Sequence, residues 1–373
     1  MPWNWEHKNW PNFIYETETL ANYEKEFLHK AGILHGSLKH ISAEDQDTLK
    51  VDLISDEAYK TSEIEGELLN RDSLQSSIRK YFGLKTDNRR VSPAEQGISE
   101  MMVDLYKNYH IPLDRTQLCA WHEMLTNGRR DLLDIGRYRT HEDPMQVVSG
   151  ALHNPKVHYE APPSSRVKTE MERFIKWFNQ SGEAGKNHLE PLTRAGVAHL
   201  YFESIHPFED GNGRIGRAIS EKALSQSLNR PTLIAISHAI ESQKKDYYAA
   251  LQRNSTGLEI NNWLEYFCAL VLRAQDHTQS RIDFLIEKGK FYQRFDDVLN
   301  ERQKKAIERI FREGVSGFKG GLSAENYITI TRTTASTATR DLQKLVELGA
   351  FTRTGERKGT RYYLNINHPS VKK

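Results

Sequence analysis

The residues best suited to chemistry lie in one short segment, IHPFEDGNGRIGR, at residues 205–217. It combines a histidine, an acidic pair, a Gly-Asn-Gly turn and two arginines. Glycines let successive backbone N–H groups point into one concavity, and the N-terminus of a following helix adds partial positive charge. The segment therefore predicts an anion cradle at Gly211, Asn212 and Gly213.

The charged side chains of this segment extend the prediction. Arg214 and Arg217 are three residues apart in the first turn of the predicted helix, so both guanidinium groups can reach an anion there. They oppose the helix dipole, which a bound anion would offset. Asp210 suits a hard cation such as Mg²⁺, and His206 could take a proton from an attacking hydroxyl. Together these residues indicate phosphoryl or nucleotidyl transfer.

Taken singly, each feature has an ordinary structural explanation. A histidine before a proline is usually a hydrogen-bonded loop residue, Gly-Asn-Gly is usually only a turn, and arginines are usually solvated. The spacing of all these residues in one segment favours chemistry over three unrelated structural roles.

A second segment, KTSEIEGELL at residues 60–69, places carboxylates where a helix dipole disfavours them. A helix is expected to end at Gly66, and Glu63, Glu65 and Glu67 surround that end. We expect cationic partners for these carboxylates. Thr61 and Glu65 are four residues apart and therefore share a face.

Helices are expected to position both segments. Apolar residues recur at helical spacing from residue 19 to about 80 and again from about 92 to 275, which predicts a helical bundle. Residues 136–163 break this pattern with turn formers and short β-branched runs, which predicts a β-hairpin over the bundle.

The C-terminal segment, from about residue 300, has a different pattern. It predicts three helices followed by two strands, the order of a winged helix-turn-helix, with residues 333–348 as the recognition helix. Basic side chains of its strands and turn could neutralise phosphates: Arg353, Arg357, Lys358 and Arg361. Winged helices also bind proteins, so DNA and protein partners both stay open.

Composition limits the class of protein. The 373 residues carry a net charge of +2 with 27% charged residues, which indicates a globular chain and gives no overall signal for nucleic acid or membrane. Cys119 and Cys268 form neither a disulfide framework nor a metal-binding spacing, and no signal peptide or run of eighteen apolar residues is evident. We expect a cytoplasmic protein without a membrane partner.

Four regions are expected along the chain. They are an N-terminal helical region (1–90), a catalytic domain (91–275), a linker helix (276–299) and a winged-helix domain (300–373).

The segment from His206 to Arg217 resembles the Fic family, whose pattern HxFx(D/E)GNGRxxR it matches at every fixed position. The resemblance implies a mainly α fold, with a helical Fic bundle and a β-hairpin flap, here followed by the winged helix-turn-helix. It also implies transfer of AMP from ATP, with Mg²⁺, to a Ser, Thr or Tyr hydroxyl of a target protein or of the chain itself.

The resemblance also implies roles for single residues. His206 would be the general base, Asp210 the Mg²⁺ ligand, and Arg214 and Arg217 the phosphate clamps. The flap would bring four residues close to the nucleotide: Val147, Val148, Ser149 and Gly150. Residues in DYYAALQRN would line the adenine and ribose pocket: Tyr247, Tyr248 and Asn254.

Residues 61–66 resemble the inhibitory motif (S/T)xxxE(G/N) of one Fic class, with Thr61, Glu65 and Gly66 at its fixed positions. In that class the glutamate pairs with the second motif arginine, here Arg217, and obstructs the seat of the ATP γ-phosphate. The resemblance therefore implies an autoinhibited adenylyltransferase, and Glu65 could also align a water that removes AMP from targets.

A different function remains as an alternative, a DNA-binding regulator whose Fic-like core senses nucleotide without transferring it. An intact His206 favours the enzyme, because a sensor needs no base. The sequence leaves open whether the chain forms a homodimer and what relieves its inhibition.

Overall fold

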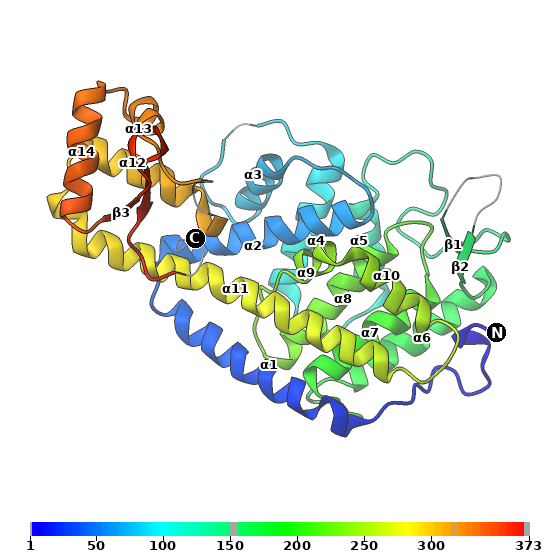
Figure 1. The fold of residues 1–373 in the computed structure, drawn as a ribbon. Coiled ribbons are helices and arrows are strands. Elements are labelled where there is room, and N and C mark those ends of the chain that lie inside the picture. Colours follow the sequence, from blue (N-terminus) through cyan, green and yellow to red (C-terminus); the bar gives the residue numbers. More distant parts are fainter. Residues whose placement is uncertain (1, 88, 150–155, 317, 319, 369–373) are drawn as a thin grey trace. The chain divides into compact units, whose positions relative to one another are not determined.

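The computed structural model describes residues 2–87, 89–149, 156–316, 318 and 320–368. Helices dominate, as predicted, with two short antiparallel hairpins (Figure 1). The helices are α1 (Thr17–Leu38), α2 (Ala43–Ile64), α3 (Arg71–Tyr81), α4 (Pro93–Asn108), α5 (Arg115–Leu125), α6 (Ser164–Gln180), α7 (Pro191–Ile205), α8 (Asn212–Ser227), α9 (Ile236–Ser242), α10 (Lys244–Arg253), α11 (Asn261–Phe295), α12 (Glu301–Arg312), α13 (Ala324–Thr331) and α14 (Ala335–Glu347). The strands are β1 (Gln146–Ser149), β2 (Lys156–Glu160), β3 (Phe351–Thr354) and β4 (Arg361–Leu364).

The chain divides into two compact units. The first comprises Met1–Gly32 and Lys50–Asp276, and the second comprises Ile33–Leu49 and His277–Lys373. Most of the N-terminal region predicted at 1–90 thus shares a unit with the predicted catalytic domain. The reason is packing, because side chains along α2 belong to the same hydrophobic core as α7 and α8: Val51, Ile54, Ala58 and Ile64.

Helices α7 and α8 form the centre of the first unit. Every residue of α7 except Glu203 is buried, as expected of a helix enclosed by other helices. Helix α8 buries Ile215 and Ile219 completely against the same core. Both ends of the loop that joins the two helices, residues 206–211, are therefore anchored in packed structure.

The hairpin expected between residues 136 and 163 is formed by β1 and β2. Val147 pairs with Tyr159 and Ser149 with Lys156, and the register shifts between Val147 and Val148. Tyr159 is buried, whereas Val147 and Val148 are 36% and 49% exposed. The hairpin thus presents one apolar edge to solvent.

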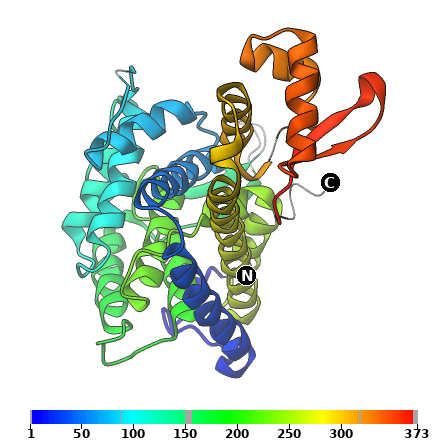
Figure 2. The same ribbon diagram turned by 90° about the vertical axis from the view of Figure 1, so that its left-hand side faces the viewer.

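The second unit has its own core. Helices α12, α13 and α14 each begin at a capping side chain that accepts a backbone hydrogen bond: Asn300, Ser323 and Thr334. The hairpin β3–β4, red in Figure 2, packs Phe351 and Leu364 into this core. The order of three helices and a hairpin is the one predicted, while its assignment as a winged helix remains a prediction.

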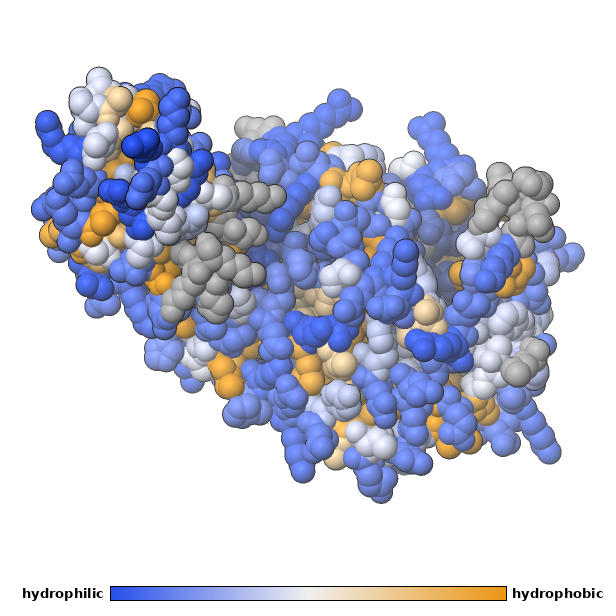
Figure 3. Space-filling view, in the orientation of Figure 1, coloured by the Kyte–Doolittle hydropathy of each residue, from blue (hydrophilic) through white to orange (hydrophobic). Residues whose placement is uncertain are grey.

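In the described part of the chain, no helix combines the length and hydropathy needed to cross a membrane. On the face drawn in Figure 3, hydrophilic side chains predominate and hydrophobic ones occur in small groups.

Candidate active site

The loop between α7 and α8 is held in one conformation by its backbone and by Asn212. His206 caps α7 with a left-handed backbone (φ 49°), and Gly211 precedes α8 with φ 81°. The Asn212 amide accepts a hydrogen bond from Phe208 N (3.0 Å) and donates one to Phe208 O (2.8 Å). Phe208 is fully buried and stacks on His122. The side chain of Asn212 therefore shapes the loop.

Arg139, which the sequence did not single out, fixes the same loop from outside. Its Nε donates to His206 O (2.8 Å), its backbone N donates to Pro207 O (3.0 Å), and Nη1 donates to Ser164 Oγ (2.9 Å). Arg139 is 2% exposed, and burial lowers its pKa to about 10. The carbonyl groups around it explain why a buried arginine is tolerated here.

Glu65 lies at the N-terminus of α8, in direct contact with Arg217. Arg217 Nη2 donates to Glu65 Oε1 (2.7 Å) and to Thr61 O (3.0 Å), and Nε donates to Thr61 Oγ1 (2.7 Å). A Cβ on Gly213 would lie 2.3 Å from Glu65 Oε1, so only glycine leaves room for this carboxylate. The carboxylate therefore fills the anion position at the start of α8.

This ion pair is buried on the arginine side. The side chain of Arg217 is 1% exposed. Burial by itself lowers the pKa of Arg217, but the carboxylate of Glu65 outweighs it and the pKa is raised. Arg217 Nη1 and Arg214 Nε are buried and have no hydrogen-bond partner among the described residues. Both groups are therefore available to donate a hydrogen bond to an anion.

The other two carboxylates at the end of α2 also have cationic partners. Glu63 Oε2 lies 2.7 Å from Lys60 Nζ, and Glu67 Oε2 lies 2.7 Å from Arg214 Nη1. Gly66 follows α2 with φ 83°, which reverses the chain between Glu65 and Glu67. The unfavourable position of the glutamates is therefore offset by ion pairs, two of them with motif arginines.

His206 and Glu203 are titratable groups of the cleft floor. Burial lowers the pKa of His206 to about 4, so its imidazole is neutral and able to accept a proton at neutral pH. Burial raises the pKa of Glu203 to about 8. Glu203 Oε2 lies 3.9 Å from His206 Nδ1. The sequence analysis missed Glu203, although a lone acidic residue one turn before the histidine in a mostly apolar helix was a usable signal.

Asp210 stands at the edge of the arginine cluster. Its Oδ1 accepts from Gly211 N (2.6 Å), and its Oδ2 lies 2.6 Å from Arg129 Nη1 and 3.5 Å from Arg214 Nη2. Burial by itself raises the pKa of Asp210, but the arginines and Gly211 N outweigh it, and the pKa is lowered. An ionised, partly exposed carboxylate beside phosphate-binding groups fits a Mg²⁺ ligand, provided that phosphates and water supply the other oxygens.

A cleft of about 680 Å³ connects these groups with the hairpin, a volume suited to a nucleotide-sized ligand. Many residues predicted for catalysis, ATP binding or inhibition line it: Glu65, Val147, Val148, Ser149, His206, Gly213, Arg217, Tyr247 and Tyr248. Further lining residues that the sequence did not suggest include His158, Glu203, Lys245 and Gln252.

Some of the predicted site residues are not among the residues that line the cleft. Asn254 is 5% exposed, is absent from the cleft lining, and donates to Ala250 O (2.8 Å), so it caps its own helix. Gly150 lies outside the described residues. Gly211, Asp210 and Arg214 adjoin the cleft lining without being part of it.

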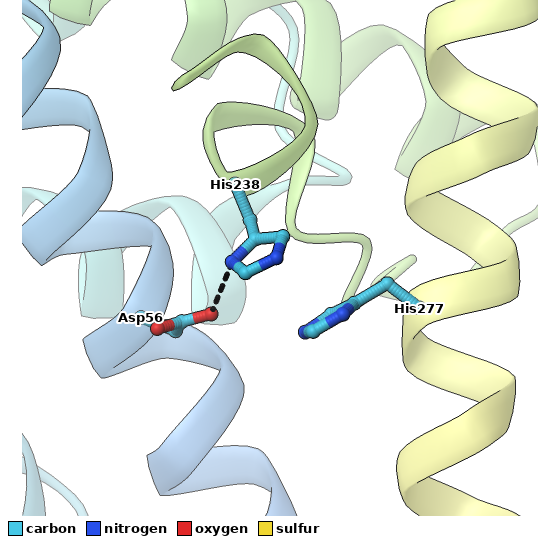
Figure 4. Close-up of side chains that lie close together, drawn as sticks. All are labelled: Asp56, His238 and His277. Atoms are coloured by element: carbon cyan, nitrogen blue, oxygen red, sulfur yellow. Dashed lines mark ion pairs between the residues drawn. The ribbon is translucent and has the colours of Figure 1, made fainter. Parts of the chain in front are cut away.

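A second cluster of titratable groups shares no residue with the cleft. Asp56 on α2 pairs with His238 on α9, at 3.4 Å between Oδ2 and Nδ1 (Figure 4). Asp56 also pairs with Arg71 at 3.2 Å. His277, also drawn in Figure 4, belongs to the second unit. The Asp56–His238 pair is thus a cross-link between helices of the first unit.

Comparisons with known protein families connect this geometry to a class of proteins. Residues 112–224 match the Fic/DOC family, and residues 3–84 match a domain of unknown function, DUF4172. The first match contains the whole loop and most of α8.

Named relatives include two adenylyltransferases. "Protein adenylyltransferase Fic" of Drosophila mojavensis is 29% identical over 130 residues, which are 34% of this chain and 24% of that protein. "Protein adenylyltransferase fic-1" of Caenorhabditis elegans is 21% identical over 251 residues, 66% of this chain and 44% of that protein. The chain thus spans less than half the length of these relatives.

Solved structures show the same fold. A Fic family protein from Desulfovibrio desulfuricans G20 has a TM-score of 0.53 at 21% identity, covering 95% of this chain and 98% of its own. A Fic domain containing signaling protein from Bacteroides thetaiotaomicron VPI-5482 has a TM-score of 0.51 at 18% identity, covering 72% of this chain and 98% of its own.

Proposed function

We propose that this chain, which contains a Fic/DOC family domain, is a protein adenylyltransferase that Glu65 holds in a restrained state. One observation carries the proposal: a single cleft joins a largely enclosed histidine, His206, a buried arginine at a helix N-terminus and a hairpin with an exposed edge. The acceptor would be a Ser, Thr or Tyr hydroxyl of a target protein or of the chain itself.

The proposed reaction forms one bond and breaks another. The acceptor oxygen attacks the α-phosphorus of ATP, His206 takes the hydroxyl proton, and the bond to the β-phosphate breaks so that pyrophosphate leaves. Arg217 and the N–H groups at the start of α8 bind the phosphate charge, and Arg214 adds a second guanidinium. Mg²⁺, held by Asp210 and the phosphates, would neutralise charge on the leaving group.

The proposed restraint follows from occupancy of the anion position. The Glu65 carboxylate contacts Arg217 where a phosphate would bind, so productive binding of the triphosphate requires Glu65 to leave. Thr61 supports this state because its hydroxyl and carbonyl oxygens both accept from Arg217.

The test is transfer of label from α-labelled ATP, with Mg²⁺, onto the chain itself. We expect weak labelling of the wild type, strong labelling of Glu65→Gly and none of His206→Ala. Absence of label in all three, with ATP binding shown by a thermal shift, would contradict adenylyl transfer and favour a different donor or a nucleotide sensor.

Removal of AMP is a related proposal for the same carboxylate. Glu65 lies in the cleft with His206 and could orient a water toward a phosphate there. A chain supplied with AMP-modified substrate should release AMP, and Glu65→Gly should abolish the release. Release that persists in this variant would refute the role.

A second candidate function, DNA binding by a nucleotide-sensing regulator, rests on the second unit. Arg353, Arg357 and Lys358 are exposed on the β3–β4 hairpin, and Arg340 is exposed on α14. Duplex DNA should then bind with an affinity that falls steeply as salt rises, and Arg357→Ala with Lys358→Ala should reduce the slope. Binding that is absent at low salt would exclude this function.

A further inference from the structure

The N-terminal segment contributes no residue to the proposed chemistry, yet it contacts three parts of the cleft wall. Each part includes a cleft-lining residue that the segment contacts: Tyr159 of β2, Ser204 in the last turn of α7 and Ser255 just after α10. Asn4, in a short 3-10 helix, is fully buried and contacts all three.

The hydrogen bonds of Asn4 use both ends of its amide. Nδ2 donates to Ser204 Oγ (2.6 Å), and the backbone N donates to Ser255 O (2.8 Å). The Tyr159 hydroxyl donates to Ser204 O (2.6 Å), with Asn4 Oδ1 as a second acceptor at 3.1 Å. Burial raises the pKa of Tyr159 well above 10, so this hydroxyl keeps its proton and donates. A side chain with a donor and an acceptor is therefore required at position 4.

The neighbouring tryptophans add contacts to β2. Trp5 Nε1 donates to Glu160 O (2.7 Å), and the Trp3 ring meets Tyr159 edge to face, with ring centroids 5.2 Å apart. A two-stranded hairpin is only marginally stable by itself, and Val147 and Val148 on its other strand are exposed. The placement of β1 and β2 thus depends on contacts outside the hairpin, and the N-terminal segment supplies several of them.

We propose that Asn4, with Trp5, is a positioning residue that fixes the hairpin β1–β2 relative to His206, so that the N-terminal segment controls alignment of the acceptor rather than nucleotide binding. Ser204, to which Asn4 donates a hydrogen bond, lies two residues before His206. The Asn4 side chain therefore connects strand β2, through Tyr159, with the turn of α7 that carries the proposed base. Small displacements between a base and its acceptor slow a transfer strongly. This role rests on the proposed adenylyl transfer.

The test uses the full-length chain in the Glu65→Gly background, which should be the active form. Asn4→Ala and Trp5→Phe are compared with Asn9→Ala, a control of the same residue type on the same segment that is exposed. Three quantities are measured: amide hydrogen exchange of β1, β2 and α8, ATP affinity by calorimetry, and label transfer at saturating ATP.

We expect Asn4→Ala to accelerate exchange in β1 and β2 about tenfold and to slow transfer about tenfold, the ratio that one lost buried hydrogen bond gives. ATP affinity should stay within about twofold, exchange in α8 should not change, and Asn9→Ala should match its parent. If Asn4→Ala fails to fold, Trp5→Phe, which keeps an aromatic ring but removes the donor to Glu160 O, decides the question.

Unchanged exchange in the hairpin would overturn the proposal. So would a parallel loss of ATP affinity and of protection in α8, because that pattern indicates a general contribution to stability. Failure of the proposed function is recognised separately, since the Glu65→Gly parent would then transfer no label at all.

Discussion

The contact between Glu65 and Arg217 is the residue pair on which the proposed restraint depends. Replacing Glu65 with Gln keeps the shape and an oxygen that can accept from Arg217 but removes the negative charge, so the pair loses its ionic attraction. We predict that Glu65→Gln raises automodification about tenfold, while Glu65→Gly raises it further because glycine also vacates the space. Initial rates of label incorporation check this.

Two neighbouring variants sharpen this prediction. Thr61→Val removes the hydroxyl acceptor of Arg217 Nε and leaves Glu65 in place, so we expect a smaller increase than for Glu65→Gln. Glu67→Gln removes one carboxylate partner of Arg214, but Asp210 still lies 3.5 Å from that guanidinium. We therefore expect Glu67→Gln to change the rate of automodification least. An increase in Glu67→Gln equal to that in Glu65→Gln would contradict a specific role for Glu65.

The pKa of His206 leads to a second prediction at this scale. Burial lowers this pKa to about 4, so the imidazole is neutral and able to act as a base at every pH above that value. In the Glu65→Gly background, kcat/KM for the acceptor should stay level between pH 8 and about 5 and fall only below pH 5. Half the activity lost near pH 6.5 would show an ordinary histidine pKa and contradict the buried base.

Arg129 is predicted to compete with the divalent cation. Its guanidinium lies 2.6 Å from Asp210 Oδ2, an oxygen that the proposed Mg²⁺ would use. We expect Arg129→Ala to lower the Mg²⁺ concentration that gives half-maximal transfer about threefold, because the carboxylate is then free for the ion. Titration of transfer against Mg²⁺ measures this, with Arg130→Ala, an exposed neighbour, as the control. If Arg129→Ala leaves this Mg²⁺ concentration unchanged or raises it, Arg129 binds phosphate rather than competing with the ion.

Local spacing pointed to residues of one segment, and the family resemblance added the distant pair of Glu65 and Arg217, which the structure brings into contact. His206, Asp210, Arg214 and Arg217 follow from local spacing, because a turn and the first turn of a helix bring them together. Arg139 and Asn4 act through backbone carbonyls and hydroxyls far along the chain, and such partners leave no periodic signal. Asn254 was predicted in the nucleotide pocket from its neighbours along the chain, and neighbours such as Gln252 do line the cleft, whereas the side chain of Asn254 donates to Ala250 O.

At the scale of elements, the junction of α7 and α8 depends on one amide. Asn212 makes both of its hydrogen bonds with the backbone of Phe208 and is 2% exposed. We predict that Asn212→Ala lowers the free energy of unfolding by about 1 to 3 kcal/mol, because two buried backbone groups lose their partner. Urea denaturation measures this, and Asn187→Ala, at an exposed loop position, should change it little. Equal effects of the two substitutions would refute a special role for Asn212.

Helices were easier to predict than strands for a physical reason. Long helices such as α6 and α11 repeat their apolar pattern over several turns, whereas β1 and β2 are four and five residues long and have exposed side chains on β1. The hairpin was therefore expected somewhere in residues 136–163, but its strands and register came only from the structure. The sequence also did not predict that residues 33–49 belong to the second unit, because this division depends on packing between segments distant along the chain.

Across the first unit as a whole, the core holds several titratable groups in their uncharged form. Burial lowers the pKa of His122, His199 and His206 to between about 3 and 4. Burial also raises the pKa of Glu57 to about 7 and that of Glu203 to about 8. Such a core loses stability on both sides of a narrow pH range. At lower pH the unfolded chain binds protons at these histidines, and at higher pH it releases protons from these carboxyl groups, whereas the folded chain does neither.

The signs of these shifts predict a stability maximum at mildly acidic pH. Below about pH 6.5 the unfolded state protonates His199 and the folded state does not, so stability falls as pH falls. Above about pH 4.5 the unfolded state ionises Glu203 while the folded state keeps its proton until about pH 8, so stability falls as pH rises over that range.

Urea denaturation at pH 5, 6, 7 and 8 measures the balance between the two effects. Each group contributes at most about 1.4 kcal/mol per pH unit, and Glu203→Gln, which cannot ionise, should flatten the decline between pH 6.5 and 8. His199→Gln should flatten the decline below pH 6.5 and leave the alkaline side unchanged. A Glu203→Gln variant with an undiminished alkaline decline would show that this carboxyl group is already ionised in the folded protein, and a charged group next to the base would then have to be included in the mechanism.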